Sequence, residues 1–172
     1  MKIDIYNQIV GYLNGIDELL SYYDAGTGYS YKYSFKAYSY ENDIYEAIES
    51  FYNDPETDLK RHEVVILNIH QIEDWEIGIF KRISYWFTSL NLSDYEVTIE
   101  FPGGEKMLQR DSFEYNNVVR RFTTLLKELL KDISFKVFYL DVFPESSSEF
   151  RWETIIFDYG KGAYFLYFYQ QG

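Results

Sequence analysis

Apolar residues recur every three or four positions along the first part of the chain. Within residues 3–23 they would lie on one face of a helix. They are Ile5, Ile9, Tyr12 or Leu13, Ile16, Leu19 or Leu20, and Tyr23. Such spacing is typical of an amphipathic helix. The polar and glycine-rich sequence DAGTG at residues 24–28 then interrupts the pattern. We therefore expect a helix over residues 3–23.

The next stretch, YSYKYSFKAYSY at residues 29–40, changes to a period of two. Its first four aromatic residues alternate with serine and lysine; they are Tyr29, Tyr31, Tyr33 and Phe35. Because successive side chains of a strand point to opposite faces, this pattern predicts a strand with one packed face and one solvated face. The parity changes at Ala37, since Tyr38 and Tyr40 fall on the solvated side. We interpret the change as a bulge or as the end of the strand.

Shorter patterns predict three elements in the middle of the chain. Asn42 or Asp43 is placed to cap a short helix that ends near Tyr52 and is closed by a proline. Residues 62–69, HEVVILNI, predict a buried strand because they are few, β-branched and almost continuously apolar. Residues 73–90 carry a helical apolar stripe, although the alternation WEIGI within them also fits a strand.

The following segment predicts a hairpin and a long helix. Apolar residues alternate over residues 95–101, and a Pro-Gly-Gly turn leads to a short return strand at residues 106–109. Asp111 and Glu114 then stand in the spacing of a capping box. A full stripe of valine, phenylalanine and leucine follows them to about residue 132, so we expect an amphipathic helix there.

Three strand-like runs end the chain, at residues 135–143, 149–158 and 163–169. The sequence DYGKG at residues 158–162 is a plausible turn between the last two. The last run, AYFLYFYQQ, has rings on both faces, so its strand is either covered on both sides or offers a patch to a partner. The pattern predicts an α+β fold, with a mixed or mainly antiparallel sheet, about four helices and a C-terminal β-hairpin.

Composition bounds the domain organisation and the compartment. A chain of 172 residues with 47% apolar residues can form one core without metals or disulfides, so we expect residues 1–172 to form a single domain. The absence of cysteine excludes disulfides, thiolate zinc sites and cysteine nucleophiles. The sequence MKIDIYNQIV lacks the apolar core of a signal peptide, and no segment has the length of a membrane span. We expect a soluble cytoplasmic protein.

No recognised catalytic or metal-binding motif is present. His62 and His70, placed on one strand, would stand about 26 Å apart at about 3.3 Å per residue, which is too far to bind one ion. The chain contains no HExxH, phosphate-binding loop or G-x-S-x-G sequence. We expect no catalytic residue, no metal and no cofactor, although 28 carboxylates leave an acid–base pair possible.

Charge and aromatic residues indicate a protein partner. The net charge of −12 argues against binding to nucleic acid, and residues 41–58 contain seven acids and no lysine or arginine. Two tyrosines precede this acidic block, and aromatic residues dominate interface hot spots. We predict a partner-binding surface formed by Tyr38, Tyr40, Glu41, Asp43, Glu46, Glu49, Asp54, Glu56 and Asp58. The alternative is that the acids form a solvated surface that serves solubility and that the tyrosines are ordinary packing.

In overall character the chain resembles the immunity proteins of bacterial polymorphic toxin systems, including those of contact-dependent inhibition. The resemblance rests on the acidic block at residues 41–58 and on the tyrosine-rich strand before it. It implies that the protein binds and neutralises a cognate basic toxin, with a nuclease as the expected class, and that it binds neither membranes nor nucleic acid. Two alternatives stay open: a phage-type inhibitor that mimics nucleic acid, and a small sugar-binding or enzymatic domain.

Overall fold

The computed structural model describes residues 2–23, 25–26, 28–57, 59–60, 63–87, 96–100, 106–110, 113–143 and 150–172. The chain divides into two compact units. The first comprises residues 1–12 and 74–131, and the second comprises residues 13–73 and 132–172. The first helix, α1 (Ile3–Tyr23), has the predicted bounds and contributes residues to both units. The organisation of the chain as one domain stays a prediction.

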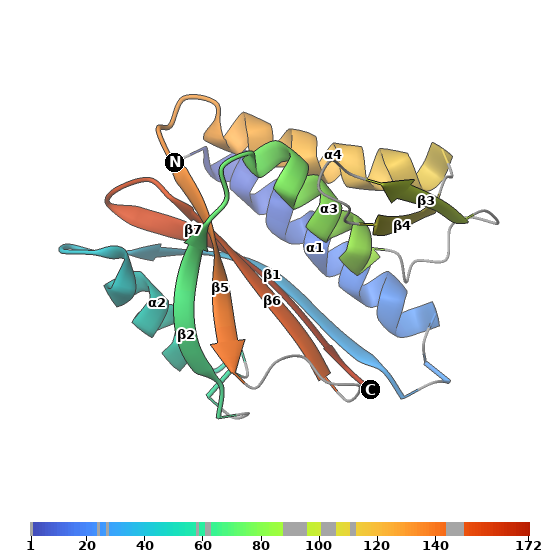
Figure 1. Ribbon diagram of the computed structural model, residues 1–172, viewed down its shortest axis with the longest axis horizontal. Coiled ribbons are helices and arrows are strands. Elements are labelled where there is room, and N and C mark those ends of the chain that lie inside the picture. The colour runs from blue at the N-terminus through green and yellow to red at the C-terminus, as the bar shows by residue number, and fades with distance from the viewer. Residues whose placement is uncertain are drawn as a thin grey trace. The chain divides into compact units, whose positions relative to one another are not determined.

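The second unit is built on a five-stranded sheet in the order β1-β7-β6-β5-β2, and all neighbouring strands in it are antiparallel (Figure 1). Its strands are β1 (Ser30–Ser39), β2 (Val65–Gln71), β5 (Lys136–Phe143), β6 (Phe150–Asp158) and β7 (Gly162–Gln171). A short helix, α2 (Ile44–Asn53), packs against β1 and β7. The α+β class and the mainly antiparallel sheet are confirmed.

The last two strands form the predicted C-terminal hairpin. The N–H group of Tyr159 donates to the carbonyl of Gly162 at 3.0 Å, and Gly160 between them has a φ of +85°, which favours glycine. Strand β7 lies between β1 and β6, and its residues 163–169 are all buried. The aromatic run AYFLYFY is therefore covered on both faces, which is the first of the two alternatives that its pattern left open.

Aromatic side chains pack against one another on both faces of this sheet. On the face covered by α2, Phe51 stacks on Phe165 with ring centroids 4.7 Å apart. On the opposite face, Tyr33 packs edge-on against Phe168 at 5.0 Å, and Phe35 stacks on Tyr164 at 5.3 Å. The predicted packed parity of β1 is confirmed for three rings, because Tyr31, Tyr33 and Phe35 are buried; the fourth ring, Tyr29, is 42% exposed.

Of the two interpretations offered for the change of parity at Ala37, the bulge is absent, whereas the strand does end close by, at Ser39. The pairing of β1 with β7 runs without a register shift from Ser30 to Ser39. The parity of the aromatic residues changes because α2 covers the second face of the sheet there, and Tyr38 packs against Phe51 and Phe165 on that face. The strand therefore gains a second packed face where we had inferred an irregularity.

The prediction that residues 62–69 form a buried strand is wrong in one respect. These residues do contribute to a strand, β2, which begins at Val65, but β2 is the last strand in the order of the sheet. Val65 is 53% exposed, and the register against β5 shifts between Ile66 and Asn68. The continuous apolar sequence therefore does not mean that both faces are covered. His62 lies outside the described residues.

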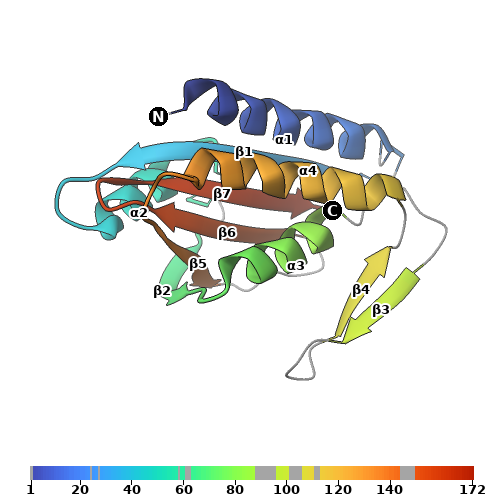
Figure 2. The same ribbon diagram turned by 90° about the horizontal axis from the view of Figure 1, so that it is seen from above.

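The first unit contains α3 (Trp75–Phe87), α4 (Phe113–Leu130) and a two-stranded sheet. This sheet pairs β3 (Glu96–Glu100) with β4 (Lys106–Arg110), and Figure 2 shows the two strands side by side. Residues 75–87 are helical, which resolves the ambiguity left by WEIGI. The Tyr12 hydroxyl donates to the Val118 carbonyl at 2.8 Å, and this bond joins the start of α1 to α4. Asp111, the first residue of the predicted capping box, lies outside the described residues.

Candidate partner-binding site

The helix α2 and its two capping residues carry four of the seven predicted acids, and the helix has one packed face and one exposed face. Asp43 caps it as predicted, since its Oδ1 accepts the Tyr45 N–H at 2.8 Å. Ile48 and Phe51 are buried against the sheet. Glu49 lies on the opposite, exposed face, whereas Tyr45 is exposed but lies on the same side of the helix as Ile48, about one turn away.

Tyr38 and Tyr40, which we predicted to border the acidic surface, are only partly exposed. The Tyr38 hydroxyl donates to Asp54 Oδ2 at 2.6 Å while its ring packs in the core. The Tyr40 hydroxyl donates to Asp158 Oδ1 at 2.5 Å and so connects the end of β1 to the C-terminal hairpin. Burial, together with the Asp158 carboxylate, raises the pKa of Tyr40 to about 12. Both tyrosines therefore have a structural role in addition to any contact with a partner.

A lysine outside the acidic block neutralises part of it. Lys36, on β1, places its Nζ 2.7 Å from Asp54 Oδ2 and 2.5 Å from Glu56 Oε2. Burial raises the pKa of the Asp54 carboxyl, but the hydrogen bonds from Lys36 and Tyr38 outweigh burial and hold that pKa below its ordinary value. The pKa of Lys36 is lowered by burial and raised more strongly by the two carboxylates, so it lies above its ordinary value.

Glu46 closes the loop that leads from β1 into α2. Its Oε2 accepts the Glu41 N–H at 2.8 Å and the Asn42 N–H at 3.4 Å, and its Oε1 accepts the Asn42 side-chain amide. The Asn42 amide and these two backbone bonds hold the pKa of Glu46 below its ordinary value. Glu46 therefore stabilises the start of α2, as Asp43 does.

The nine predicted residues thus do not form one uniform surface. Asp43, Glu46 and Asp54 stabilise the ends of α2, and Glu56 is paired with Lys36. Glu41 and Glu49 are exposed, and neither carboxylate pairs with a lysine or arginine of the described residues. Asp58 lies outside the described residues. The assignment of these nine residues to a partner surface stays a prediction.

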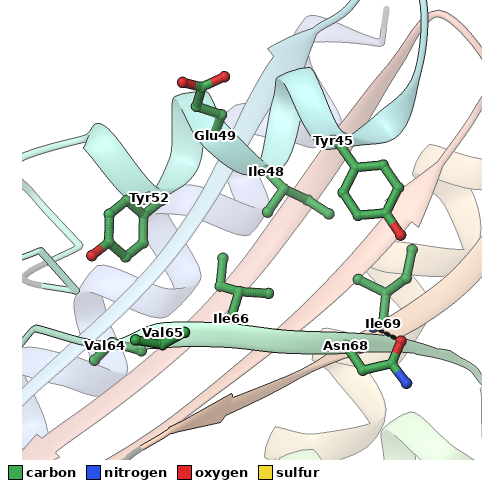
Figure 3. Close-up of a pocket in the computed structure, with 9 residues that line it drawn as sticks. All are labelled: Tyr45, Ile48, Glu49, Tyr52, Val64, Val65, Ile66, Asn68 and Ile69. Atoms are coloured by element: carbon green, nitrogen blue, oxygen red, sulfur yellow. Dashed lines mark hydrogen bonds between the residues drawn. The ribbon is translucent and has the colours of Figure 1, made fainter.

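An apolar groove of about 500 Å³ lies beside the acidic helix, between α2 and β2. Figure 3 shows Ile48 of α2 and Ile66 of β2 pointing toward each other across it, with Tyr45 and Tyr52 at its two ends. The full set of lining residues is Tyr45, Ile48, Glu49, Tyr52, Val64, Val65, Ile66, Asn68 and Ile69. We refer to this hollow as the α2–β2 groove.

Two residues that line the groove are large, apolar or aromatic, and more than half exposed. Tyr45 is 60% exposed and Val65 is 53% exposed. Among the described residues, the lining contains no lysine or arginine, and its one charged residue is Glu49. The β2 side of this groove was not predicted from the sequence, because residues 62–69 were expected to be covered on both faces. Asn68, the one polar residue within the run VVILNI, was a signal that a position there meets solvent.

The polar groups of the groove do not converge on a common point. The carboxylate of Glu49 points away from β2 in Figure 3, and Asn68 Oδ1 accepts the N–H group of Ile69 at 2.9 Å. Among the described residues, no group of three or more histidine, aspartate or glutamate side chains could hold a metal ion. His70 stacks on Tyr139 and lies 3.5 Å from Asp141. The geometry suits contact with an apolar group better than proton transfer.

Two further observations concern the chain as a whole. In its described part, no helix is both long and apolar enough to cross a membrane. Compared with protein-family models, with curated proteins and with solved structures, the chain gives no match. The function must therefore be argued from the site alone.

Proposed function

We propose that the protein is an immunity-type inhibitor that binds a cognate basic toxin in the cytoplasm and neutralises it, with a nuclease as the expected class of toxin. The observation that carries the proposal is the α2–β2 groove beside Glu49, which has no salt-bridge partner among the described residues. Exposed apolar side chains such as Tyr45 and Val65 supply the contact area that holds two proteins together. The exposed carboxylate of Glu49 on the same helix, which pairs with no lysine or arginine of the described residues, favours a basic partner.

Charge supports this proposal beyond the groove itself. The whole chain carries a net charge of −12, so its field attracts a basic protein over a distance limited by salt. Lys36 offsets Asp54 and Glu56, whereas Glu41 and Glu49 are exposed and pair with no lysine or arginine in the part of the chain that the structure describes. A nuclease fits this description, because its own substrate-binding surface must be positively charged.

The two alternatives receive less support. A sugar-binding or enzymatic domain needs polar groups that converge in the pocket, and in the α2–β2 groove Glu49 points outward while Asn68 bonds its own strand. A phage-type inhibitor would use the same acidic surface and would differ in its target. Identification of the target therefore separates these two inhibitors.

Affinity capture from the source organism tests the proposal. The purified chain is used as bait, washed at low and at high salt, and the bound proteins are identified by mass spectrometry. We expect one basic protein, bound at near equal stoichiometry and more weakly at high salt. Recovery of no specific basic protein would contradict the proposal, and recovery of a host defence nuclease would favour the phage-type alternative.

A further inference from the structure

We propose that the α2–β2 groove receives one aromatic side chain of the basic partner, flanked in the partner's sequence by lysine or arginine, and that the contact forms by insertion of this side chain and not by addition of a strand to β2. This inference rests on the proposed function and specifies how the partner is held. It adds a binding determinant on β2, a strand that lies outside the acidic block.

The shape and lining of the groove fit a large apolar side chain. Its volume of about 500 Å³ is large enough to admit one aromatic ring together with parts of the residues that flank it in the partner. Ile48 and Ile66 face each other across it, and the rings of Tyr45 and Tyr52 stand at its ends. An inserted ring would meet aliphatic side chains along the groove and aromatic rings at its ends, an arrangement that favours aromatic pairs.

Charge selects a basic partner over a second copy of this chain. Glu49 lines the groove, is exposed and pairs with no lysine or arginine of the described residues. A second copy would bring another net charge of −12 to the same surface. A lysine or arginine beside the inserted ring would instead reach the outward-pointing carboxylate of Glu49.

The edge of β2 is poorly suited to pairing with an added strand. The register of β2 against β5 shifts between Ile66 and Asn68, which interrupts the regular spacing that an added strand would need. The N–H group of Ile69 already donates to Asn68 Oδ1 at 2.9 Å. Bulges and occupied backbone groups are devices that prevent strand addition at sheet edges. The side chains of the groove are therefore its main means of recognition.

Three short peptides test the inference without knowledge of the partner. The probes are acetyl-Lys-Phe-Lys amide, acetyl-Lys-Ala-Lys amide and acetyl-Glu-Phe-Glu amide, each titrated into the full ¹⁵N-labelled chain and followed by amide chemical shifts. We expect the first peptide to shift the amides of Tyr45, Ile48, Ile66 and Ile69 in a saturable way. The alanine peptide should leave them unchanged, and the glutamate peptide should bind at least about tenfold more weakly because it opposes Glu49.

A fourth peptide and two variants separate the possible modes. Acetyl-Lys-(N-methyl)Phe-Lys amide lacks the central backbone donor and should bind as well as the first probe, because side-chain insertion does not need that donor. Tyr45→Ala should weaken the first probe by about tenfold or more, whereas the control Tyr22→Ala, at an exposed tyrosine of α1, should not. Both tyrosines are exposed, so both variants are expected to fold.

Three results would overturn the inference: equal shifts from the alanine peptide, loss of binding on N-methylation, or concentration-dependent shifts of the same amides without any peptide, which would indicate a second copy. Failure of this inference can be told apart from failure of the proposed immunity function. Peptide binding with no recovered toxin would leave the groove as a site for basic aromatic segments and count against the immunity role. A recovered toxin bound equally well by Tyr45→Ala would retain that role and reject the groove.

Discussion

Lys36 of β1 and Asp54 at the C-terminal end of α2 form an ion pair, with 2.7 Å between Nζ and Oδ2. The pair joins two elements that the sequence separates by 18 positions. It also changes the charge of the surface, since residues 41–58 contain no lysine or arginine of their own. The acidic block is therefore continuous along the sequence but partly neutralised in space.

Loss of this ion pair should destabilise the second unit. Lys36→Met leaves the largely buried Asp54 without its cation, and we expect the free energy of unfolding to fall by about 1 to 3 kcal/mol. Denaturant unfolding measures the change. The control Lys161→Met, at the exposed turn before β7, should change stability by less than about 0.5 kcal/mol. If Lys36→Met costs the same in an Asp54→Asn background, the two residues are not coupled and the account of this pair is wrong.

Asp17 of α1 should make stability depend on pH. Burial, opposed by a hydrogen bond from the Tyr33 backbone and by Lys32, raises its pKa from 3.8 to about 6. Between these two values the folded chain holds a proton that the unfolded chain has lost, so this contribution to stability falls as pH rises through that window. Above it the folded chain carries the cost of a partly buried carboxylate.

Asp17→Asn should therefore stabilise the protein at neutral pH, and the gain should shrink as the pH falls from about 6 to about 4. Urea unfolding at several pH values measures the gain. Glu73→Gln, at an exposed acid that is not among the groups that shift the pKa of Asp17, is the control and should show no such trend. A gain from Asp17→Asn that is equal at both ends of the window would show that this carboxyl does not titrate as described.

Two tyrosines that share one parity but differ in burial, Tyr33 and Tyr29, give a test of packing. Tyr33 is 2% exposed and contacts Phe168, so Tyr33→Ala should cost about 3 to 5 kcal/mol of stability. Tyr29 shares its parity but is 42% exposed, so Tyr29→Ala should cost less than about 1 kcal/mol. Thermal or denaturant unfolding compares them. Equal losses would mean that burial does not distinguish these two rings.

The two central acids of α2 should behave differently on charge reversal. Glu49→Lys should slow association with the captured partner by about tenfold at low salt and leave stability unchanged, because its carboxylate forms no ion pair with a lysine or arginine of the described residues. Glu46→Lys should instead lower the unfolding midpoint, because it removes the bonds to Glu41 and Asn42. Stopped-flow binding and unfolding curves separate the two effects. An unchanged association rate for Glu49→Lys, with Glu18→Lys as control, would remove this acid from the interface.

Periodicity was sufficient to predict most elements of the fold. The apolar stripe of residues 3–23 and the capping residue Asp43 could each be recognised from local sequence. The structure has the first helix at residues 3–23 and Asp43 at the N-terminus of α2. Spacing alone could not tell how many faces of a strand are covered. The change of parity at Ala37 reflects coverage by α2, and the apolar run of β2 lies at the end of the sheet, so both depend on elements distant in the sequence.

The candidate site was predictable only in part for the same reason. The acids of the block could be found because they lie close together in the sequence, between residues 41 and 58. The partner of Asp54 lies on β1, and the apolar wall opposite α2 lies on β2, so neither could be inferred from residues 41–58. Side chains that serve to cap a helix, such as Glu46, also cannot be separated from free ones by residue type.

Growth of a laboratory bacterial host that expresses the captured basic protein tests the central claim most directly. If the protein is an immunity-type inhibitor, the captured protein alone should arrest growth, and co-expression of this chain should restore it. Glu49→Lys should restore growth less well than the wild-type chain, whereas Glu18→Lys should restore it fully. A captured protein that is not toxic, or a growth arrest that the wild-type chain leaves unchanged, would contradict the account.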